Sequence, residues 1–132
     1  MQSAQAVIKQ GDTYWCDPDP QLVDTVGSEQ TGEHIWLIVS IKSRGKCVVA
    51  LPLSRHTEKA TVPFLITIPA SEITYVDGSP ALDRVALTDQ IRCLNKTRLG
   101  KQSGAISSRA LRSVFIGLDN LFGRYYPNPK AN

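Results

Sequence analysis

The composition of this 132-residue chain, with 42% hydrophobic residues, indicates one domain that can bury one modest core but not two. No apolar run approaches the roughly 18 consecutive residues of a membrane span. The first residues, MQSAQAVIKQ, also lack the charged and long apolar regions of a secretion signal. We therefore expect a cytoplasmic protein, with a single domain at 11–123 between flexible ends at 1–10 and 124–132.

The net charge of +3 is small, but the charged residues are distributed unevenly. Six acidic residues and no Lys or Arg lie between Gln10 and His34, whereas six basic residues and no Asp or Glu lie between Gln90 and Leu118. A fold can gather such basic residues into a positive surface for phosphates. An ordinary solvated face is the alternative interpretation of the same charges.

Five short apolar segments predict β-strands, because each is rich in β-branched, aliphatic or aromatic residues. They comprise residues 12–16, 34–41, 46–53, 62–69 and 84–94. The sequence DPDP at 17–20 disfavours helix and ends the first strand. The second and third segments are separated by a short polar turn, so we expect a hairpin in the core. Strands of this number and length suggest a small barrel.

The pattern changes to a helical one after Ser107, which is a favourable N-cap residue. Gly123 supplies a C-terminal stop. The apolar residues between them are spaced as one helical face, which we expect to pack on the barrel or on a second copy of the chain. They are Leu111, Val114, Phe115, Leu118, Leu121 and Phe122.

Six segments of the chain, taken together in order and spacing, resemble the MazF/PemK family of toxin ribonucleases. They are GDTYWCDPDP (11–20), VGSEQTG (26–32), LIVS (37–40), ALPLSR (50–55), VPF (62–64) and DQIRCLNKTRLGK (89–101). The resemblance implies a mainly β fold, an SH3-like barrel with a C-terminal helix as in MazF, PemK and CcdB.

The same resemblance implies a symmetric homodimer that cleaves single-stranded messenger RNA at short sequence motifs. It also implies a partner, an antitoxin whose acidic and flexible tail occupies the RNA-binding surface, and DNA binding by the complex with that antitoxin. Two other functions stay open: a noncatalytic module that binds RNA or antitoxin, and a gyrase-poisoning toxin of the same fold.

RNA cleavage without a metal requires a base for the ribose 2′-hydroxyl, donors that stabilise the phosphorane, and an acid for the leaving oxygen. The sequence has no paired His or carboxylate spacing typical of a metal site. We therefore expect no cofactor and a cleavage driven by the 2′-hydroxyl. Such chemistry is specific for RNA, since DNA lacks this nucleophile.

His34 and Ser54 stand where the resemblance places the family's catalytic arginine and threonine. Ser54 keeps the hydroxyl, but an imidazole lacks the permanent charge and planar fork of an arginine. His34 can instead act as general base or acid near neutral pH. The alternatives are a decayed site and a purely structural histidine at the end of a strand.

Arg55 and His56 follow Ser54 in a polar, loop-like segment. We expect Arg55 to be a third catalytic residue, because a side chain beyond the strand end can reach a phosphate and partly replace the missing arginine. His56 is a candidate RNA contact in the same way. A solvated loop explains both residues equally well.

Further candidate RNA contacts come from the resemblance. Gln30 belongs to a loop that lies beside the active site in the family and can read a base edge through its amide. Lys42 and Arg44 lie in the turn that corresponds to an RNA-gating loop in relatives, and Asp89 and Arg92 match a segment that contacts RNA or assists catalysis in some of them. For Asp89 a structural turn is the favoured alternative.

Overall fold

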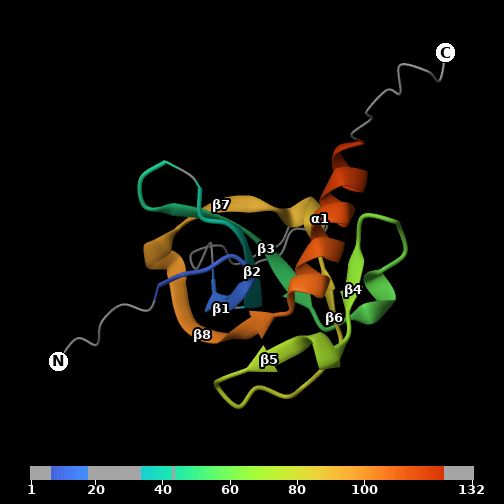
Figure 1. Cartoon of the computed structure of the whole chain (residues 1–132), viewed down its shortest axis with the longest axis horizontal. Helices are drawn as coiled ribbons and strands as arrows, with labels where there is room; N and C mark the ends of the chain where they lie inside the picture. The colour runs from blue at the N-terminus through green and yellow to red at the C-terminus, as the bar shows by residue number, and fades with distance from the viewer. Residues whose placement is uncertain (1–6, 18–33, 43, 124–132) are drawn as a thin grey trace.

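The computed structural model describes residues 7–17, 34–42 and 44–123, which form one antiparallel β-sheet, curled into a nearly closed barrel, and one α-helix (Figure 1). This confirms the predicted fold class. The strands are β1 (Asp12–Cys16), β2 (His34–Ser40), β3 (Cys47–Ser54), β4 (Ile66–Ile68), β5 (Ile73–Tyr75), β6 (Arg84–Ala86), β7 (Arg92–Asn95) and β8 (Leu99–Ile106). The helix is α1 (Ser108–Phe122), and short 3-10 turns are η1 (Thr57–Lys59), η2 (Ala70–Glu72), η3 (Thr88–Gln90) and η4 (Lys96–Arg98).

The strand order in the sheet is β4-β6-β3-β2-β1-β8-β5, and β7 pairs with another part of β3. All of these pairings are antiparallel. Antiparallel neighbours bring the end of one strand beside the beginning of the next. The end of β1, the beginning of β2, the end of β3 and the beginning of β6 therefore meet at one end of the barrel, where the candidate site lies.

The continuous apolar run of β2 is explained by burial on both faces of the sheet. Ile35, Leu37 and Val39 pack into a core covered by α1, whereas Trp36 and Ile38 pack into a second core beneath β7. Successive side chains of a strand point to opposite faces, so a strand buried on both sides needs apolar residues at every position. Trp36 is almost completely buried in this second core.

Helix α1 begins and ends as the sequence predicts. The Ser107 hydroxyl accepts a hydrogen bond from the Ala110 N–H at 3.1 Å, and Gly123 closes the helix in the left-handed conformation with φ 61°. Val114 and Leu118 are buried against the barrel. No helix in the described part of the chain is long and apolar enough to cross a membrane.

The barrel covers only part of the predicted apolar face of α1, so packing on a second copy of the chain stays a prediction for two of its residues. Phe115 and Phe122 are 37% and 62% exposed, whereas Ala110 and Gly117 are buried. The reason is close packing: a Cβ on Gly117 would come within 2.9 Å of the Phe64 carbonyl oxygen. The helix therefore faces the barrel with small residues at this point, and the aromatic rings lie to the side.

Two of the predicted strands are shorter than expected, and two observed strands were not predicted. Of residues 62–69 only Ile66–Ile68 are extended, and residues 84–94 are interrupted by η3, where the Thr88 hydroxyl donates to the Phe64 carbonyl oxygen at 2.6 Å. Strands β5 and β8 lack an apolar run. Their extended conformation depends on pairing with each other and with β1.

We predict that Gly104→Ala lowers the free energy of unfolding by about 1–3 kcal/mol, the usual cost of overpacking. A Cβ at Gly104 would overlap the Thr74 carbonyl oxygen of the neighbouring strand β5. The control is Gly45→Ala, where nothing lies within 4 Å but φ is 62°. Gly45→Ala should lower the free energy of unfolding by only about 1 kcal/mol, the cost of a left-handed backbone at a non-glycine residue. Urea unfolding measures both, and equal losses would contradict the crowding between β5 and β8.

Candidate functional site

A cavity of about 330 Å³ lies where the ends of β1, β2, β3 and β6 meet. Its polar lining is His34, Ser54, Arg55, His56 and Arg84. The three residues predicted to be catalytic, together with His56, are therefore brought to one place. Trp15, Ile35 and Leu53 form its apolar wall.

Ser54 is the last residue of β3 and is buried in the cavity wall. Its Oγ accepts a hydrogen bond from the His56 N–H at 3.1 Å, so the turn after β3 holds the serine oxygen in place. Because the oxygen acts as the acceptor in this bond, its own O–H can donate to a group in the cavity. Ser54 can therefore offer a hydrogen-bond donor to an anionic oxygen.

His34 is the first residue of β2 and is half-buried. The pairing of β2 with β3 sets Ile35 opposite Leu53, and one further step in this register sets His34 opposite Ser54. Directly opposed residues of antiparallel strands have their Cβ atoms about 4.5–5.5 Å apart. The imidazole and the serine hydroxyl are thus neighbours in the lining of one cavity.

Arg84, the first residue of β6, is a functional candidate that the sequence analysis missed. It is only 7% exposed, yet it lines the cavity. Its Nε donates to the Tyr75 hydroxyl at 2.6 Å, and the guanidinium lies 5.8 Å from the centroid of the Tyr75 ring. An arginine at the start of the short apolar run RVAL was the available signal, since a charged residue is seldom buried in a strand without a partner.

The Arg84 guanidinium forms no salt bridge with any acidic side chain among the described residues. Among the described residues its one hydrogen bond is through Nε, so none of them occupies the Nη donors. A buried cation without a counter-ion is costly, because desolvation is not offset by a paired charge. An anionic group in the cavity would offset that cost, so the lining has the chemistry that an anion-binding site requires.

Arg55 and His56 lie at the exposed side of the cavity. His56 Nδ1 lies 3.4 Å from the Glu58 carboxylate within the solvent-exposed turn η1. Exposed pairs of this kind contribute little to stability. This ion pair therefore does little to hold the fold together, and Arg55 and His56 lie where a ligand entering the cavity would pass.

The remaining predicted RNA contacts are not in the cavity lining. Lys42 and Arg44 are exposed in the turn after β2, and six residues of extended strand separate that turn from His34, about 20 Å. Asp89 and Arg92 are exposed beside β3, with Arg92 opposite Ala50. Gln30 lies outside the described residues.

No group of three His, Cys, Asp or Glu side chains is arranged to hold a metal ion in the portion of the chain that the structure describes.

The fold and its cavity define a small antiparallel barrel with a cationic, hydroxyl-bearing site at one end. The chain belongs to the family of PemK-like, MazF-like toxins of type II toxin-antitoxin systems, whose model matches residues 9–122. No match was found among curated proteins.

Solved structures of MazF proteins have the same fold. MazF from Deinococcus radiodurans superimposes with a TM-score of 0.67 at 23% identity, over 91% of this chain and 100% of that one. A mycobacterial endoribonuclease in complex with its cognate antitoxin gives a TM-score of 0.62 at 24% identity, over 92% and 100% of the two chains. The Mycobacterium tuberculosis toxin MazF-mt6 gives 0.62 at 12% identity, over 87% and 99%.

Trp15 positions one wall of the cavity through its indole N–H, which donates to the Asp77 carboxylate at 2.9 Å. Hydrogen bonds from the Ser79 side chain and from this indole lower the pKa of Asp77 to about 2. The partners stabilise the charged carboxylate. The Trp15 contact therefore stays charge-assisted at every physiological pH.

We predict that the indole N–H resonance of Trp15 shifts in an NMR titration with a midpoint near pH 2, where Asp77 becomes protonated. Because folding lowers the pKa of Asp77, its charged carboxylate stabilises the fold at pH values above the ordinary pKa of 3.8. This stabilisation is lost as the pH falls towards 2. The Trp36 indole is the internal control. Movement of both resonances together would instead indicate unfolding by acid, and a midpoint near 3.8 would contradict the hydrogen bonding.

Proposed function

We propose that this protein is the toxin of a type II toxin-antitoxin system and acts as a metal-independent endoribonuclease that cleaves single-stranded mRNA at short sequence motifs. Family membership supports the toxin assignment. The observation that carries the chemistry is the cavity in which Arg84, a buried guanidinium with no counter-ion among the described residues, meets Ser54 and His34. A phosphodiester is the anion that these groups suit.

The scissile phosphate binds between Arg84 and Ser54 in this proposal. The guanidinium presents planar N–H donors to two phosphoryl oxygens, and the Ser54 hydroxyl donates a further hydrogen bond. These donors become more effective as charge develops on the phosphorane, because Arg84 and Ser54 are buried and their donors are already oriented. They supply the charge stabilisation that His34 alone cannot provide.

His34 moves the proton. It accepts the proton of the 2′-hydroxyl as that oxygen attacks phosphorus, and the bond from phosphorus to the 5′-oxygen breaks. The leaving 5′-oxygen takes up a proton from an acid of the site or from water. The products are a 2′,3′-cyclic phosphate and a 5′-hydroxyl, so atoms and charges balance without a metal or cofactor. Arg55 and His56 guide the strand at the mouth of the cavity.

The proposed partners follow from the family and from the surface. A symmetric homodimer fits the exposed apolar side chains of α1, Phe115, Ile116 and Phe122, which are unusual for a monomer surface. An antitoxin with an acidic tail suits the same cationic groups that hold the RNA. We place the protein in the cytoplasm, where messenger RNA is available.

Purified full-length protein should cleave a long single-stranded RNA equally with and without EDTA, leave DNA of the same sequence intact, and produce 2′,3′-cyclic phosphate ends. Ser54→Ala should lower the rate by about 10²-fold, the usual effect of losing one transition-state donor. Ser108→Ala, at an exposed serine of α1, is the control and should cleave normally.

Intact RNA at high protein concentration would contradict the endoribonuclease and indicate a noncatalytic module that binds RNA or antitoxin. Inhibition of gyrase supercoiling with intact RNA would instead indicate a gyrase-poisoning toxin of the same fold.

We predict that Arg84→Gln lowers cleavage by about 10²–10³-fold, because it removes a preorganised cation from the phosphate. Removal of a buried charge that lacks a carboxylate should leave the free energy of unfolding unchanged or higher. Arg84→Lys should recover only part of the rate, since a lysine lacks the planar fork. Single-turnover rates and urea unfolding test both effects.

Arg112→Gln is the matched control for this series, because it removes one exposed positive charge from α1, outside the cavity lining. A wild-type rate for Arg84→Gln would show that Arg84 plays no part in cleavage. A loss of both rate and stability would indicate a structural role.

A further inference from the structure

A second hollow, of about 620 Å³, lies apart from the catalytic cavity and shares none of its lining residues. It is bounded by Ile8, by Tyr14 of β1, by η4 and by the first residues of β8. Its walls are more apolar than polar, and it lies within the range of about 300–1,000 Å³ that is usual for ligand sites.

Tyr14 forms part of the wall of this hollow, and its hydroxyl is buried. The residue is only 6% exposed, and its hydroxyl has no hydrogen-bond partner among the described residues. Burial, with a smaller effect from the nearby charge of Asp12, raises the pKa of Tyr14, so the hydroxyl stays protonated. Trp36, its cross-strand neighbour, also has a buried indole N–H without a partner. Buried polar groups are normally paired, so the described residues around Tyr14 and Trp36 leave two buried donors without an acceptor.

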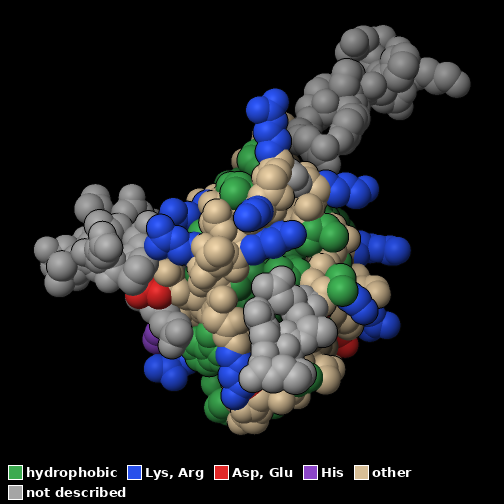
Figure 2. Space-filling view, turned by 90° about the vertical axis from the view of Figure 1, so that its left-hand side faces the viewer, with side chains coloured by type: hydrophobic (Ala, Val, Ile, Leu, Met, Phe, Trp, Pro, Cys, Tyr) green, Lys and Arg blue, Asp and Glu red, His purple; other side chains and the backbone are tan. Residues whose placement is uncertain are grey.

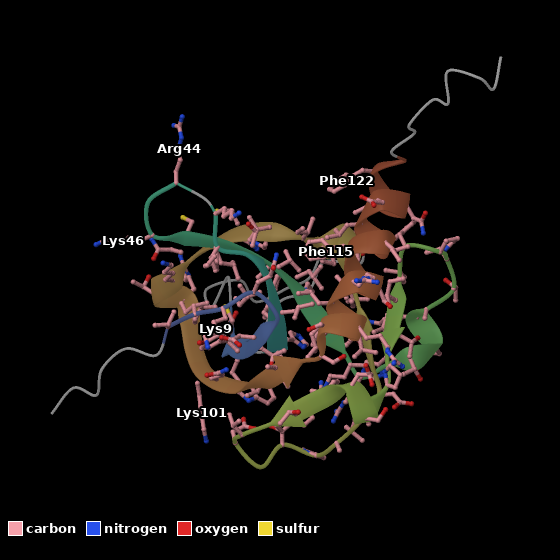
Figure 3. All side chains as sticks on the ribbon, in the orientation of Figure 1. Lys9, Arg44, Lys46, Lys101, Phe115 and Phe122 are labelled. Atoms are coloured by element: carbon pink, nitrogen blue, oxygen red, sulfur yellow. The ribbon has the colours of Figure 1, made fainter. Side chains whose placement is uncertain are left out.

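Cations surround the hollow. Lys46 and Lys96 belong to its lining and form no salt bridge with any residue that the structure describes. Figure 2 shows that Lys and Arg far outnumber Asp and Glu on this face of the molecule. Figure 3 shows Lys46 pointing outward to the left, with Lys101 below it pointing down and Arg44 at the tip of the turn above it. Such a face attracts a chain of phosphates.

Two side-chain amides in the lining have complementary groups available. The Asn95 Oδ1 is occupied by the Thr97 N–H and hydroxyl, both at 3.0 Å, which leaves its NH₂ as a donor. The Gln102 NH₂ donates to the Gly104 carbonyl oxygen at 3.1 Å, which leaves its Oε1 as an acceptor. A donor and an acceptor beside apolar walls suit the edge of an unstacked nucleobase.

We infer that this hollow is an accessory binding site for one nucleotide of the RNA strand, with the base inside and its phosphates at Lys46 and Lys96. The inference rests on the proposed function. Cys16 pairs with His34 on one side and with Leu99 on the other, so two strand spacings, about 10 Å, separate the catalytic His34 from the hollow's wall. One strand of RNA can reach both sites. An acidic peptide would use the lysines but not the base-edge groups.

The test is the affinity of the full-length protein for a fluorescein-labelled RNA strand of mixed sequence in which fluorine replaces every 2′-hydroxyl, so that binding is measured without cleavage. Lys46→Ala combined with Lys96→Ala should weaken binding roughly tenfold and lower the slope of log affinity against log salt by about 1.4, the value for two phosphate contacts on a single strand. Arg109→Ala combined with Arg112→Ala removes the same charge from α1 and should have a much smaller effect.

Tyr14→Phe tests recognition of the base by the hydroxyl without changing the charge of the protein. It should weaken binding about fivefold, the effect of one hydrogen bond, with an unchanged salt slope. Its melting temperature should stay the same or rise, because the variant removes an unpaired buried hydroxyl. A variant that bound RNA weakly because it misfolded would instead have a lower melting temperature.

Three results would overturn the accessory site. Wild-type affinity for both the lysine and the tyrosine variants would show that RNA does not use it. A changed oligomeric state of these variants by light scattering would show that a second copy of the chain covers the hollow. Weaker binding of polyglutamate, with RNA affinity unchanged, would assign the face to an acidic peptide. Failure of the wild-type protein to bind any RNA would instead contradict the proposed function itself.

Discussion

The antiparallel register of β1, β2, β3 and β6 is the constraint on which the rest of this structure depends. It fixes which strand ends meet, and therefore which side chains can share a cavity. His34 and Ser54 are separated by a hairpin in the sequence but become cross-strand neighbours. A shift of one residue would turn each side chain to the opposite face of the sheet and separate the two groups. The buried runs on both sides of β2 make such a shift costly.

In the proposed function, Arg84 supplies a positive charge that the family resemblance would place at another position. The resemblance implies an arginine where this chain has His34, and the described part of the cavity holds a guanidinium contributed by a different strand, β6. Among the described residues, Tyr75 restrains that guanidinium through a hydrogen bond and a ring contact, and no carboxylate pairs with it. This matters because a paired carboxylate would neutralise the charge, whereas a tyrosine hydroxyl orients the arginine and leaves its charge for an anion.

The two hollows differ in the chemistry of the side chains that line them. The smaller one combines a hydroxyl, an imidazole and a buried cation, which suits a reacting phosphate. The larger one combines apolar walls, amides and an unpaired aromatic hydroxyl, which suits recognition. Each takes one wall residue from β1, Trp15 for the smaller hollow and Tyr14 for the larger. The exposed aromatic residues of α1 belong to neither hollow and form a separate apolar surface.

The sequence alone determined the strands and helix whose pattern is local. Continuous apolar runs identified β1, β2 and β3, and Ser107 and Gly123 identified the ends of α1, because capping and periodicity depend only on nearby residues. Motif resemblance identified the family and singled out His34, Ser54 and Arg55.

Tertiary structure alone decided the elements and contacts that depend on distant partners. Strand β8 has no apolar run and is extended because β1 and β5 flank it, and Gly104 permits their close approach. Arg84 looked like an ordinary strand residue until the register of β6 against β3 set it beside the cavity. The sequence could not show that Tyr14 would be buried without an acceptor, because burial and hydrogen bonding are set by residues far away in the chain.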